Sequence, residues 1–448
     1  MTRPRATRRI WFSAFPAAML IVSSKSFLSS TSVTRKSPGG VRRRSTTGKT
    51  TAATATAAST TYPAPQAPQG SPRGDLFSLD FPELSEALGG SGRAKMVWAA
   101  IAAGVDPLTE DAAAEFLTDK TTAVLRETVE GLPCQVVRQS VSSCGTRKLL
   151  VRLEDGLEVE TVVIPNLNGK RSTVCVSSQI GCAENCQFCM TGKMGLIRNL
   201  SAGEIVGQVF FALKAVREHE MPPLTNAVYM GMGEPLDNPG AVKRSLQLLT
   251  HPLTLAMAKS KISVSTVGPS PTAIRRMKEM PCRLAWSVHA ATDEVRRLLV
   301  PTTVHTMAQL RDAFAEVLQS RGREHVFVEV VLIERVNDTP ELARALAALL
   351  RPLPTRASIN LLPYNDTGHP LFRASPKERV EEFQKVLMEE GFVATIRMAR
   401  GDEESSACGQ LATSAKDERV LQQRHRNTGD IDTAVTAPPF TRLTARHQ

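Results

Sequence analysis

The chain has 448 residues, of which 42% are hydrophobic and 22% charged, an ordinary composition for a globular enzyme that excludes a small disulfide scaffold. The net charge of +11 points to nucleic acid, but residues 1–74 contain 12 Lys and Arg and no Asp or Glu, which leaves 43 basic and 44 acidic residues in the rest. The body of the chain is close to neutral, so its net charge alone does not predict a nucleic-acid partner.

Residues 1–74 have the composition of an organelle import signal, because they are rich in Ser, Thr, Ala and Arg. Their apolar run, residues 10–24, is too short to span a bilayer comfortably. We expect a disordered leader with a plastid (chloroplast) transit peptide; a mitochondrial address is the alternative, and a disordered basic arm that binds RNA is a third interpretation. The sequence predicts no membrane association.

Residues 75–150 form a predicted N-terminal accessory domain. From about Leu79 to Thr128 the segments are amphipathic with few turn breakers, which favours a small helical module. Alternating apolar and polar residues then flank the turn dipeptide Asp155-Gly156, which predicts a β-hairpin.

Residues 151–413 form the predicted catalytic core. Six apolar strand candidates, "NAVYMGM", "KISVST", "RLAWSVHA", "HVFVEVVLI", "RASINLLPY" and "FVATIRM", alternate with helical stretches. Repeated βα units imply a parallel sheet that is buried on both faces, as an open or closed α/β barrel. Function is then expected at the carboxyl ends of the strands. Residues 414–448 are predicted to be a disordered tail.

The segment "GCAENCQFCMTG" holds Cys182, Cys186 and Cys189 at Cys-x3-Cys-x2-Cys spacing. Structural zinc needs four protein ligands, and Cys175, seven residues upstream, is the one local candidate for the fourth. Three thiolates without a fourth also suit an iron-sulfur cluster with one iron open to a small molecule. The residues alone leave both interpretations open.

Six blocks in colinear order carry a resemblance: "CVSSQIGCAENCQFCMTG", "YMGMGEPL", "ISVSTVG", "WSVHA", "INLLPYN" and "ARGDEESSACGQLA". They resemble the radical S-adenosylmethionine (SAM) enzymes, and among these the dual-specificity RNA adenine-C2 methyltransferases of the RlmN/Cfr family. The resemblance spans about residues 90–413. It implies a partial (β/α)6 TIM-like radical SAM barrel with the helical accessory domain and the β-hairpin.

The resemblance also implies the cofactors and their ligands. The three cysteines of the motif would hold a [4Fe-4S] cluster whose open iron chelates SAM and reduces it to a 5′-deoxyadenosyl radical. The residues implied in SAM binding are Gly233, Glu234, Ser265, Ser287, Val288, His289 and Asn365.

A mechanism with two SAM molecules follows from the same resemblance. Cys408 would accept a methyl group, lose a hydrogen atom to the radical and add its methylene carbon to adenine C2. Glu160 would accept the C2 proton, and Cys175 would attack Cys408 to release the product and leave a transient disulfide.

The implied partners are 23S-type rRNA, tRNA next to the anticodon, and an electron donor such as a ferredoxin or flavodoxin. The chain itself is expected to be a monomer. The target adenosine must leave its stack or lie in single-stranded RNA. The helical module resembles an accessory domain that grips RNA. Candidate phosphate contacts are Lys193, Arg198, residues 275–278, Arg296, Arg297, Arg397 and Arg400.

Three alternatives stand beside this interpretation. Methylation of adenine C8 uses the same machinery. A non-catalytic, zinc-stabilised RNA-binding protein would explain the cysteine motif, but it leaves Cys408 and Cys175 without a role. A radical enzyme that does not act on RNA would not need the "ACGQLA" block.

Overall fold

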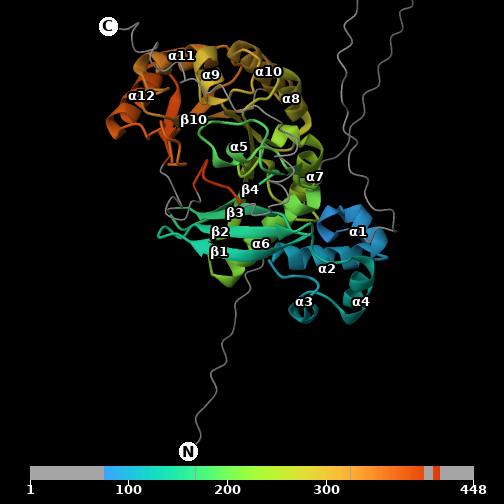
Figure 1. Cartoon of the computed structure of the whole chain (residues 1–448). Helices are drawn as coiled ribbons and strands as arrows, with labels where there is room; N and C mark the ends of the chain where they lie inside the picture. The colour runs from blue at the N-terminus through green and yellow to red at the C-terminus, as the bar shows by residue number, and fades with distance from the viewer. Residues whose placement is uncertain (1–74, 167, 323, 398–406, 414–448) are drawn as a thin grey trace, which may run out of the picture. The chain divides into compact units, whose positions relative to one another are not determined.

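A computed structural model describes residues 75–166, 168–322, 324–397 and 407–413 (Figure 1). The leader, the tail and Arg400 lie outside the described residues. All described residues belong to one compact unit. No helix of the described chain is long and apolar enough to cross a membrane.

The predicted helical module is present. It consists of a 3-10 turn and four short helices, each with a polar or glycine residue at its start. A capping box between Asp80 and Glu83 fixes the start of the first helix, since each side chain accepts from the other residue's backbone N–H. The elements are η1 (Leu76–Ser78), α1 (Phe81–Ala87), α2 (Ser91–Ala102), α3 (Glu110–Glu115) and α4 (Asp119–Thr128).

The predicted β-hairpin is part of a larger antiparallel unit. β2 (Arg147–Leu153) pairs with β3 (Glu158–Pro165) around Asp155-Gly156, as the sequence predicts. A further strand, β1 (Cys134–Val141), pairs with the other edge of β2. The domain boundary predicted after residue 150 falls inside β2, and the division into two domains stays a prediction.

A single ten-stranded sheet runs in the order β1-β2-β3-β4-β7-β8-β9-β10-β11-β12. All six predicted strands are present as β7 to β12, and every neighbouring pair among them is parallel. β4 was not among the predicted strands; it pairs antiparallel with β3 and parallel with β7. The bounds are β4 (Ser172–Val176), β7 (Leu224–Tyr229), β8 (Ile262–Thr266), β9 (Arg283–Ser287), β10 (Val326–Leu332), β11 (Ala357–Pro363) and β12 (Val393–Ile396).

Helices connect the parallel strands, as right-handed βα crossovers require (Figure 1). The longest is α6 (Ala202–Glu218), whose Ser201 cap and Glu204 form a capping box and most of whose residues are buried. The others are α5 (Met190–Met194), α7 (Pro239–Thr250), α8 (Pro271–Arg275), α9 (Asp293–Leu299), α10 (Met307–Ser320), α11 (Pro340–Leu350) and α12 (Lys377–Glu389). A two-stranded ladder, β5 (Gln179–Ile180) with β6 (Arg198–Asn199), frames the cysteine segment.

Alternation along β10 explains how the sheet presents a site. Val326, Val328 and Val330 are buried, whereas Phe327 and Glu329 are only partly buried. Because successive side chains of a strand point to opposite faces, every second position lies on the inner face of the curved sheet. The polar residues at the carboxyl ends of β7 to β11 therefore converge.

Candidate functional site

The three motif cysteines lie in the loop between β5 and α5, at the carboxyl side of β4. This loop needs glycine at its start: Gly181 has φ +72°, and a Cβ there would lie 1.8 Å from the carbonyl oxygen of Gly195. The N–H of Cys182 donates to the same carbonyl at 3.1 Å. The backbone thus folds the loop so that Cys182, Cys186 and Cys189 line one pocket.

The donor set of this pocket fits an iron-sulfur cluster. Burial raises the pKa of the Cys182 and Cys186 thiols, and neighbouring thiols of the set raise both further. No group of three or more His, Cys, Asp or Glu in the described part of the chain is arranged to hold a single metal ion. Cys175, the fourth zinc ligand that the sequence offered, does not line the pocket with the other three.

Glu234 lines the pocket from the loop that follows β7. Its carboxylate accepts from the backbone N–H groups of Leu236 (2.9 Å) and Val267 (3.0 Å), which fixes its direction. Burial raises its pKa to about 8. Gly233 has φ +94° and lies against Gln179, where a Cβ would be 2.5 Å from the Gln179 side chain. Any side chain at position 233 would therefore press on Gln179, whose Oε1 accepts from the Glu234 N–H at 2.7 Å.

Of the remaining predicted SAM-binding residues, all but one line the same pocket. The hydroxyls of Ser265 and Ser287 are 2.8 Å apart across β8 and β9. His289 has φ +53°, and its Nδ1 accepts from the N–H of Val331 at 3.1 Å. Burial, with a contribution from a nearby Arg, lowers the pKa of His289 to about 3, so the ring is neutral. Val288 is fully buried and does not line the pocket, and its N–H donates to the Glu329 carbonyl at 3.0 Å.

Cys408 reaches the pocket from far along the chain, on the segment of residues 407–413. Four hydrogen bonds join this segment to α5 and to the loop after β11. The N–H of Met190 donates to Gly409 (2.8 Å), Thr191 Oγ1 to Leu411 (2.5 Å), Asn365 Nδ2 to the Cys408 carbonyl (3.0 Å), and Gln410 Nε2 to Asp366 (3.1 Å). The segment is thus docked on the helix that follows the cysteine motif and on the loop after β11.

The Cys408 residue is solvent-exposed, while its thiol lines the pocket. Burial of the Cys408 thiol raises its pKa to about 11, and the Glu329 carboxylate raises it further. The buried Cys175 thiol also has a raised pKa, first from burial and then from Cys408. The two thiols predicted to form a disulfide are therefore within electrostatic range of each other.

Glu160 lies on the face of β3 that also carries Cys175 on β4, because Val162 pairs with Cys175 and side chains two apart share a face. Its Oε1 pairs with Lys148 Nζ at 2.9 Å, and its Oε2 accepts from the N–H of Ala412 at 2.9 Å. Burial raises its pKa, and the Lys148 ammonium partly offsets that rise. A carboxylate predicted to accept a proton is thus tied directly to the segment that carries Cys408.

Two pocket features escaped the sequence prediction. Glu329 of β10 lines the pocket beside Cys408. A single carboxylate in the otherwise apolar strand "HVFVEVVLI" was the signal for it. The other is Glu184, inside the cysteine motif, whose carboxylate and carbonyl both accept from Thr302.

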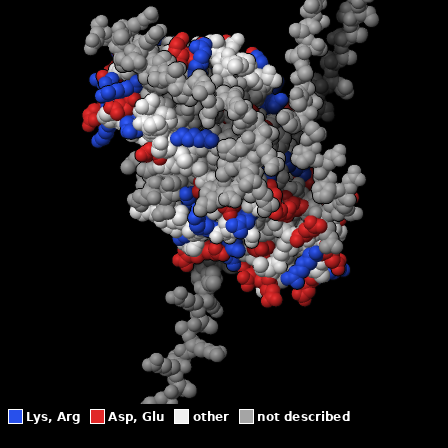
Figure 2. Space-filling view, viewed as in Figure 1, with Lys and Arg blue, Asp and Glu red and all other residues white. Residues whose placement is uncertain are grey.

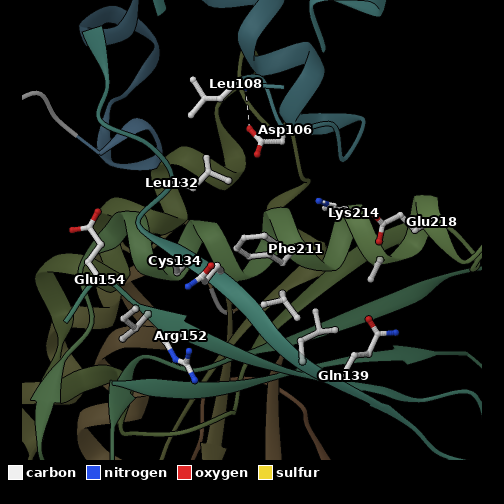
Figure 3. A pocket seen from close by; sticks show the side chains of 15 residues that line it. Asp106, Leu108, Leu132, Cys134, Gln139, Arg152, Glu154, Phe211, Lys214 and Glu218 are labelled. Atoms are coloured by element: carbon white, nitrogen blue, oxygen red, sulfur yellow. Dashed lines mark hydrogen bonds and ion pairs between the residues drawn. The ribbon is translucent and has the colours of Figure 1, made fainter. Parts of the chain in front are cut away.

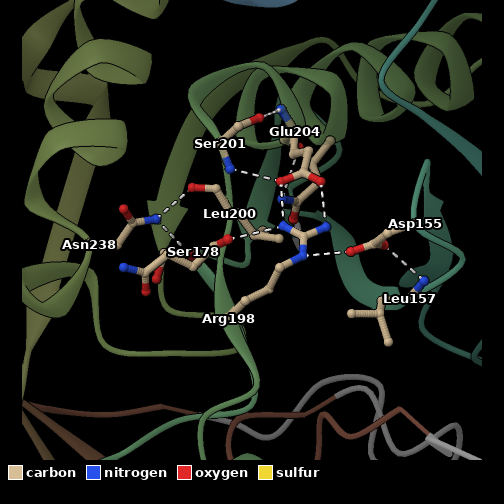
Figure 4. Close-up of polar contacts among 10 residues, drawn as sticks. Asp155, Leu157, Ser178, Arg198, Leu200, Ser201, Glu204 and Asn238 are labelled. Carbon is tan, nitrogen blue, oxygen red and sulfur yellow. Dashed lines mark hydrogen bonds and ion pairs between the residues drawn. The ribbon is translucent and has the colours of Figure 1, made fainter. Parts of the chain in front are cut away.

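One of the predicted phosphate contacts is wrong, and a second is held in ion pairs within the chain. Arg296 is 1% exposed, and it donates to the backbone carbonyls of Val288 (3.0 Å) and Val267, so it joins the ends of β9 and β8. Arg198 is held by two carboxylates, Asp155 at 2.7 Å and Glu204 at 2.7 Å (Figure 4). Arg296 is therefore closed to a phosphate, whereas a phosphate contact through Arg198 stays a prediction.

The other predicted contacts differ in how accessible they are. Arg397 is exposed at the end of β12, and its charge acts on both Glu329 and Cys408. Lys193 Nζ donates to the carbonyl of Thr367 at 3.1 Å. In the stretch 275–278, Arg275 pairs with Glu316, while Met277 is fully buried.

A second, larger cavity lies away from the cysteines (Figure 3). It measures about 610 Å³, against about 160 Å³ for the cysteine pocket, and lies between β1, β2, α6 and the start of the α3 region. Charges of both signs line it, including Arg152, Glu154, Lys214 and Glu218. Its single thiol, Cys134, is buried with a raised pKa. The volume of a cavity therefore does not identify the candidate active site. The polar groups that converge in the smaller pocket identify it.

Comparisons with known proteins agree with this placement. The model of the Radical SAM superfamily matches residues 176–346, which include the three motif cysteines. The dual-specificity RNA methyltransferase RlmN of Dinoroseobacter shibae is 37% identical over 387 residues, 81% of this chain and 94% of that protein. RlmN of Marinobacter nauticus is 41% identical over 305 residues, 67% of this chain and 82% of that protein.

A solved structure is similar as well. It is the crystal structure of a radical SAM methyltransferase from Sphaerobacter thermophilus, which is 37% identical and superposes with a TM-score of 0.69. The superposition covers 75% of this chain and 98% of that one. Cys175 and Cys408 lie outside the residues that the superfamily model matches.

Proposed function

Because the chain belongs to the RlmN family of dual-specificity RNA methyltransferases, within the radical SAM superfamily, we propose that it methylates C2 of an adenosine in 23S-type rRNA, and in tRNA next to the anticodon. One observation carries this proposal. Cys408 and the three motif cysteines line one pocket, and Glu160 is hydrogen-bonded to the segment that bears Cys408.

Cys182, Cys186 and Cys189 would hold the [4Fe-4S] cluster, and Glu234, Ser265, Ser287, His289 and Asn365 would surround SAM. The chemistry that these cofactors supply when bound is one-electron reductive cleavage of SAM. Gly233 lets the Glu234 carboxylate stay within reach of the amino-acid end of SAM. Val288 is buried between Ser287 and His289, which both line the pocket.

Cys408 accepts the methyl group as its thiolate, because the thiolate is the nucleophilic form. Its raised pKa means that the thiol is protonated at neutral pH in the free protein. A sulfonium beside the sulfur stabilises the thiolate, whereas Glu329 opposes it. A positively charged group bound in the pocket would therefore favour ionisation of Cys408.

Glu160 and Cys175 complete the reaction on the other side of Cys408. Glu160 accepts the proton from adenine C2, and its raised pKa makes it a stronger base than an exposed carboxylate. Cys175 attacks the sulfur of Cys408 as a thiolate: the S–S bond forms while the bond between that sulfur and the methylene carbon breaks, and the carbon takes the electron pair and a proton to become the methyl group of the released base. Their shared face of the sheet supports these roles.

The RNA itself would approach over the exposed face of β1 and β2. Arg138 pairs with Leu150, and Leu150 with Glu160, so Arg138 shares the face of Glu160. Residues 131–153 carry four basic residues and no acidic ones. The module of residues 75–130 carries eleven acidic and four basic residues, and Figure 2 shows acidic side chains gathered over it. Charge therefore favours the strands over the helices as the phosphate contact.

We also propose that the chain works in a plastid, with a mitochondrion as the alternative address, and takes electrons from a ferredoxin- or flavodoxin-like donor. The acid-free composition of residues 1–74 supports the import. Fusion of these residues to a fluorescent protein tests it: plastid fluorescence agrees with the proposal, and fluorescence throughout the cytosol contradicts it.

The experiment that tests the activity is anaerobic reconstitution of the chain with iron and sulfide, followed by SAM, dithionite and unmodified rRNA. Mass spectrometry of the nucleosides should show 2-methyladenosine with the wild type and none with Cys408→Ala. Formation of 8-methyladenosine would replace the C2 assignment by the C8 alternative. A colourless protein that copurifies with zinc would overturn the enzyme assignment.

A further inference from the structure

Glu329 is a pocket carboxylate to which neither the resemblance nor the proposed mechanism gives a role. It lies in the middle of β10, level with Ser287 on β9 and Asn360 on β11. Asn360 is in turn level with Thr395 on β12. Four neighbouring strands thus present one row of polar side chains across the inner face of the sheet.

Hydrogen bonds fix the orientation of this row. Thr395 Oγ1 donates to Asn360 Oδ1 at 2.7 Å, and Asn360 Nδ2 donates to Glu329 Oε1 at 2.8 Å. Because the Asn360 amide oxygen accepts from the Thr395 hydroxyl, the amide turns its NH2 group toward Glu329. Within the described part of the chain, no side chain or backbone group donates a hydrogen bond to the other carboxylate oxygen, Oε2.

The place of this carboxylate limits what it can touch. The Glu329 carboxylate raises the pKa of the Cys408 thiol, and both residues line the same pocket. In the proposed reaction the carbon on Cys408 bonds to the target base, so a group beside Cys408 lies beside that base. Glu329 is therefore on the substrate side of the pocket.

The chemistry of adenosine decides which atom it meets. An ionised carboxylate only accepts hydrogen bonds. The ring nitrogens of adenine are acceptors as well, which leaves the N6 amino group of the base and the ribose hydroxyls as donors. N6 is the donor that distinguishes adenine from guanine and inosine, which carry an oxygen at that position.

We infer that Glu329 recognises the target adenosine by accepting a hydrogen bond from its N6 amino group, with Asn360 and Thr395 as the positioning residues that aim its carboxylate. This inference rests on the proposed function and adds the residue that selects the base. It also explains why a charged group occupies an otherwise apolar strand.

The test is a protein-by-substrate cycle on the full, reconstituted chain. A short RNA carries at the target position adenosine, purine riboside (which lacks N6), inosine or 2′-deoxyadenosine. With the wild type, kcat/KM for purine riboside should fall about 10- to 100-fold relative to adenosine, as expected for loss of a hydrogen bond to a charged group. In Glu329→Ala the two substrates should be used equally.

Glu329→Gln gives a sharper result. Asn360 would donate to the new amide oxygen, so the amide NH2 would face the base and would match an oxygen at position 6. Its preference should therefore shift from adenosine toward inosine. Glu341→Gln, at an exposed carboxylate in the first turn of α11, is the matched control and should keep the wild-type ranking.

Each other outcome overturns the inference. Equal use of adenosine and purine riboside by the wild type would exclude N6 recognition. A selective loss with 2′-deoxyadenosine that Glu329→Ala abolishes would assign the carboxylate to the ribose instead. A variant that no longer methylates Cys408 in the absence of RNA, seen by intact mass, would assign it to SAM. If the wild type methylates no adenosine at all, the proposed function fails and the inference fails with it.

Discussion

Glu160 depends on its neighbour Lys148 for its ability to accept a proton. The carboxylate must be ionised to act, so activity should fall as the pH drops through its raised pKa. The Lys148 ammonium, 2.9 Å away and largely buried with it, favours the ionised form. Lys148→Met should therefore raise the pKa of Glu160 further.

We expect the acidic limb of the pH–rate profile for Lys148→Met to move upward by about one pH unit. Single-turnover methylation between pH 5 and 9 measures it. Lys120→Met, an exposed residue of α4, is the control and should leave the profile unchanged. A downward shift with Lys148→Met would contradict the assignment of Glu160 as the base.

Individual residues differ in how far the sequence could predict them. The three cysteines and Gly233-Glu234 are local motifs, whose spacing already encodes the loop that places them. The burial of Arg296 is not local, because it depends on carbonyl groups from two strands that the sequence places far apart. The position of Glu329 beside Ser287 and Asn360 follows only from the register of β9, β10 and β11, which the sequence does not show.

At the scale of elements, Arg198 joins three of them. It lies on β6 and pairs with the turn between β2 and β3 through Asp155 and with the first turn of α6 through Glu204 (Figure 4). Arg198→Ala would leave the largely buried Glu204 carboxylate without its cation. We expect a loss of about 2 kcal/mol in the free energy of unfolding, between the values for surface and buried pairs.

Differential scanning fluorimetry with an RNA-binding titration checks this prediction. Arg198→Ala should lower the Tm by several degrees and leave RNA affinity nearly unchanged. Arg275→Ala, which breaks the exposed pair with Glu316, is the matched control and should leave the Tm nearly unchanged. An unchanged Tm with weaker RNA binding would identify Arg198 as a phosphate contact.

The elements themselves were largely predictable. Apolar runs and their flanking turns identified six parallel strands and the hairpin, since these signals lie within a few residues of each strand. β1 and β4 were not recognised as separate strands of the sheet. β4 joins the antiparallel and parallel halves, and such a role depends on partners on both sides, β3 and β7, that no local pattern reveals.

At the scale of the whole molecule, the distribution of charge separates the two candidate RNA surfaces. The module of residues 75–130 is acidic, whereas β1 and β2 present Arg138 on the face of Glu160. Arg138→Ala should weaken RNA binding and reduce the slope of log K against log salt by about 1. Lys120→Ala, on the acidic module, should change neither quantity.

Filter binding at several salt concentrations measures both variants. Equal losses for Arg138→Ala and Lys120→Ala would contradict the assignment of the strands as the phosphate contact. The net charge of the chain could not have made this distinction, because the basic excess belongs to residues 1–74 and the surface charges of the body cancel in the sum.

The central claim is that Cys408 bonds to RNA and that Cys175 releases it. Its most direct test is intact mass spectrometry of Cys175→Ala after reaction with SAM, a reductant and rRNA under anaerobic conditions. Without the second thiol, the protein should carry a covalent RNA adduct that maps to Cys408, while the wild type carries none at completion. A Cys175→Ala protein that turns over normally and accumulates no adduct would contradict the account.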